Sequence, residues 1–275
     1  MPADQSGIRQ NNAFGAMLAH SRRDSMDTIA DREPSLAVEG PVATLTLCRP
    51  SQHNRIAPED CTVIDGLLAR AASTQGVRVL VITGTGDKTF SSGYTLGAIL
   101  DQLDSRFEDM LDRLERFALP TVCAMNGSIY GGATDLALCC DLRIGVRGSR
   151  MLMPASRFGL HYYPGGLRRY VGTLGLATAK KLFMTARAIS DEEMLRVGFL
   201  SELVEPAALR STVDSYVQDL LACAPGVLAT IKSDLMDTAY CTAIPEVLRA
   251  HYQESLASPE LAQRLVAMGV GKAVS

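Results

Sequence analysis

Two glycine-containing turns are the strongest candidates for chemistry in this sequence. One is residues 90–94 (Phe-Ser-Ser-Gly-Tyr), and the other is residues 130–133 (Tyr-Gly-Gly-Ala) at the start of an expected helix. Glycine permits close approach of the backbone, and a helix N-terminus carries unpaired N–H donors with partial positive charge. Such donors stabilise an oxyanion at little reorganisation cost. The alternative is that Gly131 and Gly132 only form a tight strand-to-helix turn, and these residues alone leave both interpretations open.

A carboxylate follows the second turn at the spacing of one helical turn. Asp135 lies three residues after Gly132, so its side chain could face whatever the free N–H groups bind and carry a proton to or from it. The alternative is an ordinary acidic residue in the first turn of a helix, which interacts favourably with the helix dipole. Position alone favours the alternative.

Several common catalytic and metal-binding motifs are absent from the sequence. Lys88 and Thr89 follow Asp87 rather than glycine, residues 84–86 lack the third glycine of a dinucleotide fingerprint, and no Gly-x-Ser-x-Gly motif occurs. The four histidines are far apart, and the seven cysteines are scattered without a Cys-x-x-Cys pair. We therefore expect no metal site, and mostly buried thiols in a reducing compartment.

Alternating strand and helix patterns could position the two turns. A strand pattern ends at Arg49-Pro50, and a helix with Pro58 in its first turn follows. That first strand covers residues 41–47, and further segments are predicted as strands (77–83, 120–125, 142–146) and as helices (101–117, 133–140, 177–186, 191–197). Beyond Pro206 only helical periodicity remains. These patterns predict a flexible arm over residues 1–33, an α/β core over 34–205 and a helical subdomain over 206–275.

Composition and charge narrow the class of protein. The chain has 275 residues, of which 47% are hydrophobic, and its 27 Lys and Arg residues against 30 Asp and Glu give a net charge of −3. Without a basic run, a nucleic-acid partner is not expected. No apolar run approaches the ~20 residues that cross a bilayer, so no membrane partner is expected. The polar N-terminus lacks the pattern of an export signal, and its Asp residues argue against a mitochondrial presequence. A cytoplasmic protein is the expectation.

Residues 126–141 (Asn-Gly-Ser-Ile-Tyr-Gly-Gly-Ala-Thr-Asp-Leu-Ala-Leu-Cys-Cys-Asp) closely resemble the signature of the crotonase superfamily, the enoyl-CoA hydratase/isomerase group. Residues 90–94 are similar to the other oxyanion segment of that family, and Arg49-Pro50 followed by Asn54 resembles its first loop. Residues 154–166, 185–189 and 198–204 also follow in the family's order. The resemblance covers about residues 36–205 well and the helical tail loosely.

This resemblance implies a fold, a substrate and a set of site residues. The fold would be α/β, a crotonase-type ββα spiral core with a C-terminal α-helical subdomain that forms a homotrimer or a dimer of trimers. The substrate would be an acyl-CoA thioester, with coenzyme A as part of the substrate and no separate cofactor. The thioester oxygen would bind the N–H groups of Tyr94 and Gly132, with Asp135 as acid/base. The residues implied in substrate binding are Arg55, Ile56, Ser92, Thr95, Leu96 and Gly131.

Two departures from the family pattern bear on the reaction. Hydratases of the family carry glutamate at the position of Asp135 and a second glutamate where this chain has Ala155. A single carboxylate suits double-bond isomerisation, α-proton exchange or decarboxylation more readily than hydration. His161 and the adjacent residues 162–163 (Tyr-Tyr) are candidates for a compensating group, although a loop histidine is more often a surface or packing residue.

These arguments predict an enzyme of the enoyl-CoA hydratase/isomerase type with one carboxylate. The alternatives are another crotonase-type reaction, such as that of a decarboxylase or hydrolase, or a non-catalytic protein that binds CoA or supports an assembly. Arg168 and Arg169 could contact CoA phosphates, or they could form salt bridges on a helix.

Overall fold

The structure, a computed structural model, describes residues 30–268. The chain divides into two units, residues 1–30 and 31–275, and every described helix and strand belongs to the second. The described residues form a six-stranded sheet in which β1 is antiparallel to β2 and all other neighbours are parallel. In spatial order its strands are β1 (Ser35–Glu39), β2 (Val42–Leu47), β3 (Val79–Gly84), β5 (Thr121–Met125), β7 (Leu142–Val146) and β10 (Glu202–Val204).

A second sheet of four short strands among the described residues carries the two glycine turns. Its strands are, in order, β4 (Thr89–Ser91), β6 (Ser128–Tyr130), β8 (Arg150–Leu152) and β9 (Ile189–Ser190). In each of the consecutive pairs β3–β4, β5–β6 and β7–β8, the first strand joins the large sheet and the second joins the small sheet. A helical segment follows each pair. This repeated ββα path is the spiral that the resemblance implied.

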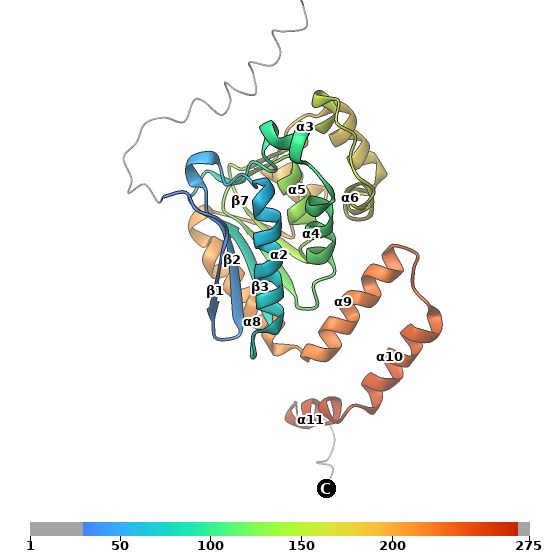
Figure 1. The fold of residues 1–275 in the computed structure, drawn as a ribbon. Helices are drawn as coiled ribbons and strands as arrows, with labels where there is room; N and C mark the ends of the chain where they lie inside the picture. The colour runs from blue at the N-terminus through green and yellow to red at the C-terminus, as the bar shows by residue number, and fades with distance from the viewer. Residues whose placement is uncertain (1–29, 269–275) are drawn as a thin grey trace, which may run out of the picture. The chain divides into compact units, whose positions relative to one another are not determined.

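Helices surround the sheets and continue to the end of the described chain (Figure 1). Those before β10 are α2 (Pro58–Ser73), α3 (Ile99–Gln102), α4 (Ser105–Glu115), α5 (Gly132–Leu138), α6 (Pro164–Thr185) and α7 (Asp191–Arg196). After β10 come α8 (Leu209–Ala222), α9 (Pro225–Ala239), α10 (Pro245–Ala257) and α11 (Pro259–Ala267). No strand follows Val204 within the described residues.

The large sheet is packed on both faces, since most residues of its central strands β3, β5 and β7 are buried. Side chains of a strand alternate between faces. Val79 and Val81 belong to an apolar cluster with Val213 and Val217 of α8. Leu80 and Ile82, which alternate with these valines along β3, belong to the larger core cluster. That cluster includes apolar residues of α2, α4 and α5. The helix α8 therefore completes the packing of the sheet that the α/β core forms.

Most of the longer predicted elements agree with the structure. Strand β7 coincides with the prediction at 142–146, and α2 begins at Pro58 as expected. The helix predicted at 177–186 is wrong in extent, because it is the second half of α6, which also contains the non-helical Gly175 (φ 76°, ψ 158°). The two- and three-residue strands of the small sheet were not predicted, since such short segments show no periodicity.

The last three helices expose many apolar side chains. No residue of α9, α10 or α11 is buried. Their exposed apolar residues include Val227, Ile231, Leu235, Val247, Tyr252, Leu256 and Leu265. None of the helices in residues 30–268 is both long and apolar enough to cross a membrane. The predicted arm over residues 1–33 lies outside the described residues except for its last four.

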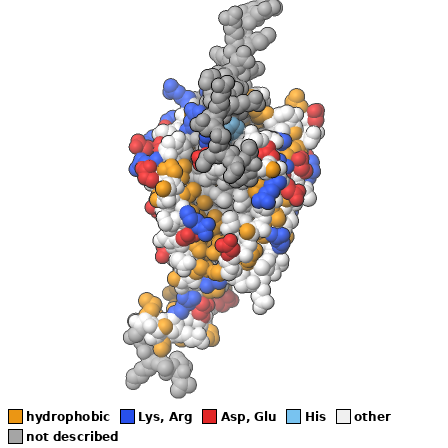
Figure 2. All heavy atoms as spheres, turned by 90° about the vertical axis from the view of Figure 1, so that its left-hand side faces the viewer, with side chains coloured by type: hydrophobic (Ala, Val, Ile, Leu, Met, Phe, Trp, Pro, Cys, Tyr) orange, Lys and Arg blue, Asp and Glu red, His pale blue; other side chains and the backbone are white. Residues whose placement is uncertain are grey.

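The charged side chains drawn in Figure 2 are mixed in sign. On the part of this face that the described residues form, Lys and Arg lie near Asp and Glu, with hydrophobic side chains between them. This agrees with the small net charge of −3. On this face, the described residues therefore offer no continuous basic surface of the kind that binds a polyanion.

We expect Gly127→Ala to destabilise the fold, because Gly127 lies where β6 approaches β4. A Cβ atom at this position would lie 2.4 Å from the carbonyl carbon of Lys88 and 2.6 Å from the backbone nitrogen of Thr89. Backbone atoms cannot move aside as a flexible side chain can, so the free energy of unfolding should fall by about 1–3 kcal/mol. Urea unfolding followed by circular dichroism measures this change.

The matched control is Gly66→Ala in α2, where a Cβ atom would meet nothing within 4 Å. In a helix interior this substitution should raise the free energy of unfolding by about 0.5–1 kcal/mol. Equal effects of the two substitutions would contradict the close approach of the backbones at Gly127.

Candidate functional site

The two glycine turns lie against each other. Gly93 has φ +84°, and a Cβ atom there would lie 2.6 Å from the carbonyl oxygen of Tyr130 and 2.8 Å from the backbone nitrogen of Gly132. Only glycine fits both this conformation and this spacing. The absence of a side chain at residue 93 therefore brings the Tyr94 and Gly132 segments close together.

Among the described residues, the N–H groups of Tyr94 and Gly132 have no hydrogen-bond acceptor. Gly132 is the first residue of α5, where a helix leaves its N–H groups unpaired. Neighbouring N–H groups are occupied, since Gly131 donates to the carbonyl of Leu152 (2.9 Å) and Thr95 to that of Ile56 (2.9 Å). Within residues 30–268, no hydrogen bond is found for the N–H of Tyr94 or of Gly132. These two donors remain available to a ligand.

The loop before α2 holds the segment that carries Tyr94. The backbone N–H of Ile56 donates to the carbonyl of Gly93 (2.8 Å), and that of Ser92 donates to the carbonyl of His53 (2.8 Å). The Arg55 guanidinium donates to the hydroxyl of Thr95 (2.6 Å). The structure thus joins the predicted substrate-binding residues of both segments. Leu96, the next residue, is exposed and begins a short 3-10 turn.

Asp135 is fully buried and paired with a buried arginine. Arg169 of α6 donates from Nε to Oδ1 (2.8 Å) and from Nη2 to Oδ2 (3.0 Å). The side chains of Asp135 and Arg169 are 0% and 1% exposed, so this is a bidentate ion pair inside the protein. Burial alone would lower the pKa of the Arg169 guanidinium, but its hydrogen bonds to carboxylates raise the pKa above its ordinary value.

Tyr163 is the third partner of Asp135. Its hydroxyl donates to Oδ2 of Asp135 and lies 3.3 Å from the hydroxyl of Tyr162. The two tyrosine rings are stacked, with centroids 4.4 Å apart. Burial, followed by the nearby Tyr162 and Asp135, raises the pKa of Tyr163 well above its ordinary value, so the phenol stays protonated as a donor. Gly166 makes room here, since a Cβ atom would lie 2.2 Å from the Tyr162 ring.

His161, the other predicted compensating residue, is exposed in the segment before α6. Within the described part of the chain it forms no hydrogen bond or ion pair. Ala155, at the position of the missing second carboxylate, is buried in the main apolar cluster. Of the three candidates in residues 161–163, the structure therefore brings Tyr163 to Asp135 and leaves His161 apart from it.

Further carboxylates surround Arg169, which favours the salt-bridge alternative for this residue. Its Nη1 also donates to Asp112 (2.7 Å) and to Glu115 (3.1 Å), both on α4. A guanidinium that is buried and bound to three carboxylates is not available to CoA phosphates. The salt-bridge alternative applies to Arg168 as well, which donates to Glu115 (2.5 Å) and lies over the ring of Tyr240.

Sequence reasoning did not assign Arg169 to Asp135. The available signal was a charged residue next to Tyr170 on the apolar side of a helix, but α6 was not predicted over this stretch. It also missed Phe107 of α4, which packs directly on the glycine turn. A Cβ atom at Gly132 would lie 2.7 Å from Cζ of Phe107. The Phe107 ring meets those of Tyr94 and Tyr163 edge-on, with centroids 5.2 Å and 6.2 Å away.

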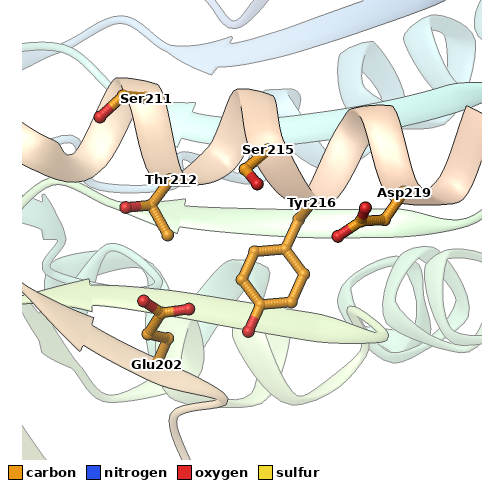
Figure 3. Close-up of a pocket in the computed structure, with 6 residues that line it drawn as sticks. All are labelled: Glu202, Ser211, Thr212, Ser215, Tyr216 and Asp219. Atoms are coloured by element: carbon orange, nitrogen blue, oxygen red, sulfur yellow. The ribbon is translucent and has the colours of Figure 1, made fainter.

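A hollow elsewhere on the described surface does not include these residues (Figure 3). It has a volume of about 460 Å³ and lies between α8 and β10. Its lining is mostly polar and consists of Glu202, Ser211, Thr212, Ser215, Tyr216 and Asp219. No predicted site residue lines it, and the chemistry of the two glycine turns is separate from it.

Comparison with known proteins identifies related sequences over most of the chain. The enoyl-CoA hydratase/isomerase family model matches residues 37–264. A short-chain-enoyl-CoA hydratase from Clostridium acetobutylicum is 29% identical over 197 residues, which are 69% of this chain and 76% of that protein. An (E)-benzylidenesuccinyl-CoA hydratase from Thauera aromatica is 31% identical over 202 residues, 70% of this chain and 77% of that protein.

Solved structures agree with the fold. A Thermobifida fusca YX protein, provisionally named an enoyl-CoA hydratase and determined in complex with CoA, has a TM-score of 0.72 and 29% identity over 84% of this chain and 94% of its own. An enoyl-CoA hydratase from Bacillus anthracis has a TM-score of 0.76 at 20% identity, covering 86% and 96% of the two chains. The expected crotonase-type α/β fold is thus confirmed, and the chain belongs to the enoyl-CoA hydratase/isomerase family of enzymes, within the crotonase superfamily.

Proposed function

We propose that this enzyme hydrates or isomerises an enoyl-CoA thioester. In this proposal the N–H groups of Tyr94 and Gly132 bind the thioester oxygen, and Asp135 is the acid/base group. Charge develops on that oxygen when an enolate forms, so fixed donors stabilise the transition state more than the ground state. The names of the relatives from Clostridium acetobutylicum and Thauera aromatica support a CoA thioester as the substrate class.

One observation supports the proposal: the close approach of Gly93, the residue before Tyr94, to the backbone nitrogen of Gly132. Gly93 lies so near Gly132 that a single methyl group would collide with its nitrogen, at 2.8 Å. A turn needed only for the path of the chain would have no reason to leave both donors unpaired so near each other. Gly131 and Gly132 are only partly buried, which is consistent with a ligand binding at this turn.

Coenzyme A would be held largely by main chain in this proposal. The segments around Arg55-Ile56 and Ser92–Leu96 are already hydrogen-bonded to each other, which fixes the backbone that a ligand would contact. Coenzyme A enters as part of the substrate, with no separate cofactor. We also propose that the exposed apolar side chains of α9, α10 and α11 pack in a homotrimer or a dimer of trimers, and that the enzyme is cytoplasmic.

The single carboxylate bears on which reaction is catalysed. With Ala155 in place of a second acid, water addition lacks the usual pair of proton carriers, so isomerisation or a decarboxylase-like reaction through the same enolate is the second candidate. Loss of the enone absorbance of crotonyl-CoA would show hydration. Retention of that absorbance, together with exchange of α-hydrogens in a saturated acyl-CoA, would favour isomerisation.

We expect Gly93→Ala to abolish most activity by separating the two donors. The new methyl group would lie 2.8 Å from the nitrogen of Gly132, and the backbone at φ +84° would be strained. Displacement of an oxyanion donor lowers the rate by on the order of 100-fold. The readout is the rate of α-hydrogen exchange of butyryl-CoA in D₂O, measured by mass spectrometry.

Gly97→Ala is the matched control in the same segment. A Cβ atom at Gly97 would meet nothing within 4 Å, so this variant should exchange at a rate close to that of the unmodified protein. Full activity of Gly93→Ala would contradict a role for the two N–H groups.

We expect Asp135→Asn to lower the exchange rate by about 100-fold or more, because the amide cannot take up a proton as a carboxylate does. The substitution also leaves the buried Arg169 less neutralised, so thermal unfolding must be measured in parallel. Asp112→Asn is the control, since Asp112 binds the same guanidinium (2.7 Å) but is half exposed. Exchange that survives in a folded Asp135→Asn protein would remove Asp135 from the mechanism.

A further inference from the structure

Both carboxylate oxygens of Asp135 accept hydrogen bonds from side chains of this chain. Oδ1 accepts from Nε of Arg169, and Oδ2 accepts from Nη2 of Arg169 and from the hydroxyl of Tyr163. The side chain is 0% exposed. A proton that reaches Asp135 along its hydrogen bonds therefore passes Arg169 or Tyr163. The guanidinium of Arg169 keeps its protons at all physiological pH values. The phenol of Tyr163 is therefore the partner that can transfer a proton to Asp135.

Tyr163 also lies on the outer side of this group. It is half-buried, whereas Asp135 and Arg169 are fully buried. Its ring meets Phe107, and Phe107 packs on Gly132 and on the ring of Tyr94. Phe107 therefore contacts both the ring of Tyr163 and the segments that carry the two proposed oxyanion donors.

We propose that Tyr163 carries the proton between the α-carbon of the acyl-CoA substrate and Asp135. This inference rests on the proposed function and adds a residue to it. The α C–H bond breaks and its proton moves to the Tyr163 oxygen, while the phenol proton moves to Oδ2 of Asp135. The electron pair of the C–H bond enters the thioester enolate, whose oxygen binds the N–H groups of Tyr94 and Gly132. The reverse transfer returns a proton to carbon.

The charges around Asp135 favour transfer of this kind. Three carboxylates, those of Asp112, Glu115 and Asp135, share two guanidinium groups, those of Arg168 and Arg169. This group carries one excess negative charge, which uptake of one proton removes. A phenolate next to Tyr162 and Asp135 is disfavoured, because burial and these neighbours raise the pKa of Tyr163. The two proton movements are therefore concerted, and the phenol is neutral before and after.

The test is Tyr163→Phe, which removes the hydroxyl and retains the ring that stacks on Tyr162 and meets Phe107. We expect the α-hydrogen exchange rate of butyryl-CoA in D₂O to fall by about 100-fold or more. Its dissociation constant, measured by calorimetry, should change by less than about threefold, since the N–H donors are untouched. Thermal unfolding checks that the variant is folded.

Tyr162→Phe is the matched control. Its hydroxyl is adjacent in sequence and lies 3.3 Å from that of Tyr163, but it forms no hydrogen bond with Asp135 among the described residues. Exchange should stay within about fivefold of that of the unmodified protein, because no proton carrier is lost. A similar loss in both variants would indicate a packing effect and overturn the proposal.

A ring-fluorinated tyrosine at residue 163 separates proton transfer from positioning. It keeps the hydroxyl and its hydrogen bond but makes the phenol more acidic. If the phenol carries the proton, the exchange rate changes as ring fluorines are added and the phenol becomes more acidic, and a rate that does not respond to fluorination overturns the proposal. The role of Tyr163 is also overturned if Tyr163→Phe exchanges at the rate of the unmodified protein while Asp135→Asn does not exchange. That result would leave the proposed function intact. Absence of exchange in the unmodified protein with bound butyryl-CoA would overturn both.

Discussion

The ion pair between Asp135 and Arg169 is the constraint on which the centre of this protein depends. Taking two charges out of water costs several kcal/mol for each ion, and only close pairing with further hydrogen bonds offsets that cost. The structure meets this requirement with a bidentate contact and with Asp112 and Glu115 as additional acceptors. Asp112 and Glu115 come from α4, Asp135 from α5 and Arg169 from α6. These contacts to Arg169 therefore fix three helices relative to one another.

The same constraint sets the chemistry that is available at the glycine turns. The backbone of α5 provides an unpaired N–H at Gly132, and its next turn provides Asp135. Their relative position follows from the helix itself, whereas the position of Tyr94 follows from the missing side chain at Gly93. The buried charges therefore belong to the side chains of Asp135 and Arg169. The unpaired donors near them are backbone N–H groups, which do not need to reorganise when a ligand binds.

The sequence allowed the fold to be predicted further than the surroundings of the site. Apolar runs and glycine turns were enough for β2, β7, α2 and the start of α5, because each has a local signal. The pairing of Asp135 with Arg169 joins residues 34 positions apart, and no local pattern encodes it. Arg168 and Arg169 are adjacent and chemically identical, yet one is buried and the other is exposed. That difference depends on which side of α6 faces α5.

The position of α8 has a consequence for building chimeras from this chain. Val213 and Val217 cover Val79, Val81 and their neighbours on one face of the large sheet. The hydroxyl of Tyr240, just beyond α9, donates to Glu115, which also accepts from Arg169. An exchange of residues 206–275 with those of a relative would therefore replace the side chains that cover this face of the sheet, together with the hydroxyl that donates to Glu115. The change from strands to helices near residue 205 is not a place where the molecule can be cut.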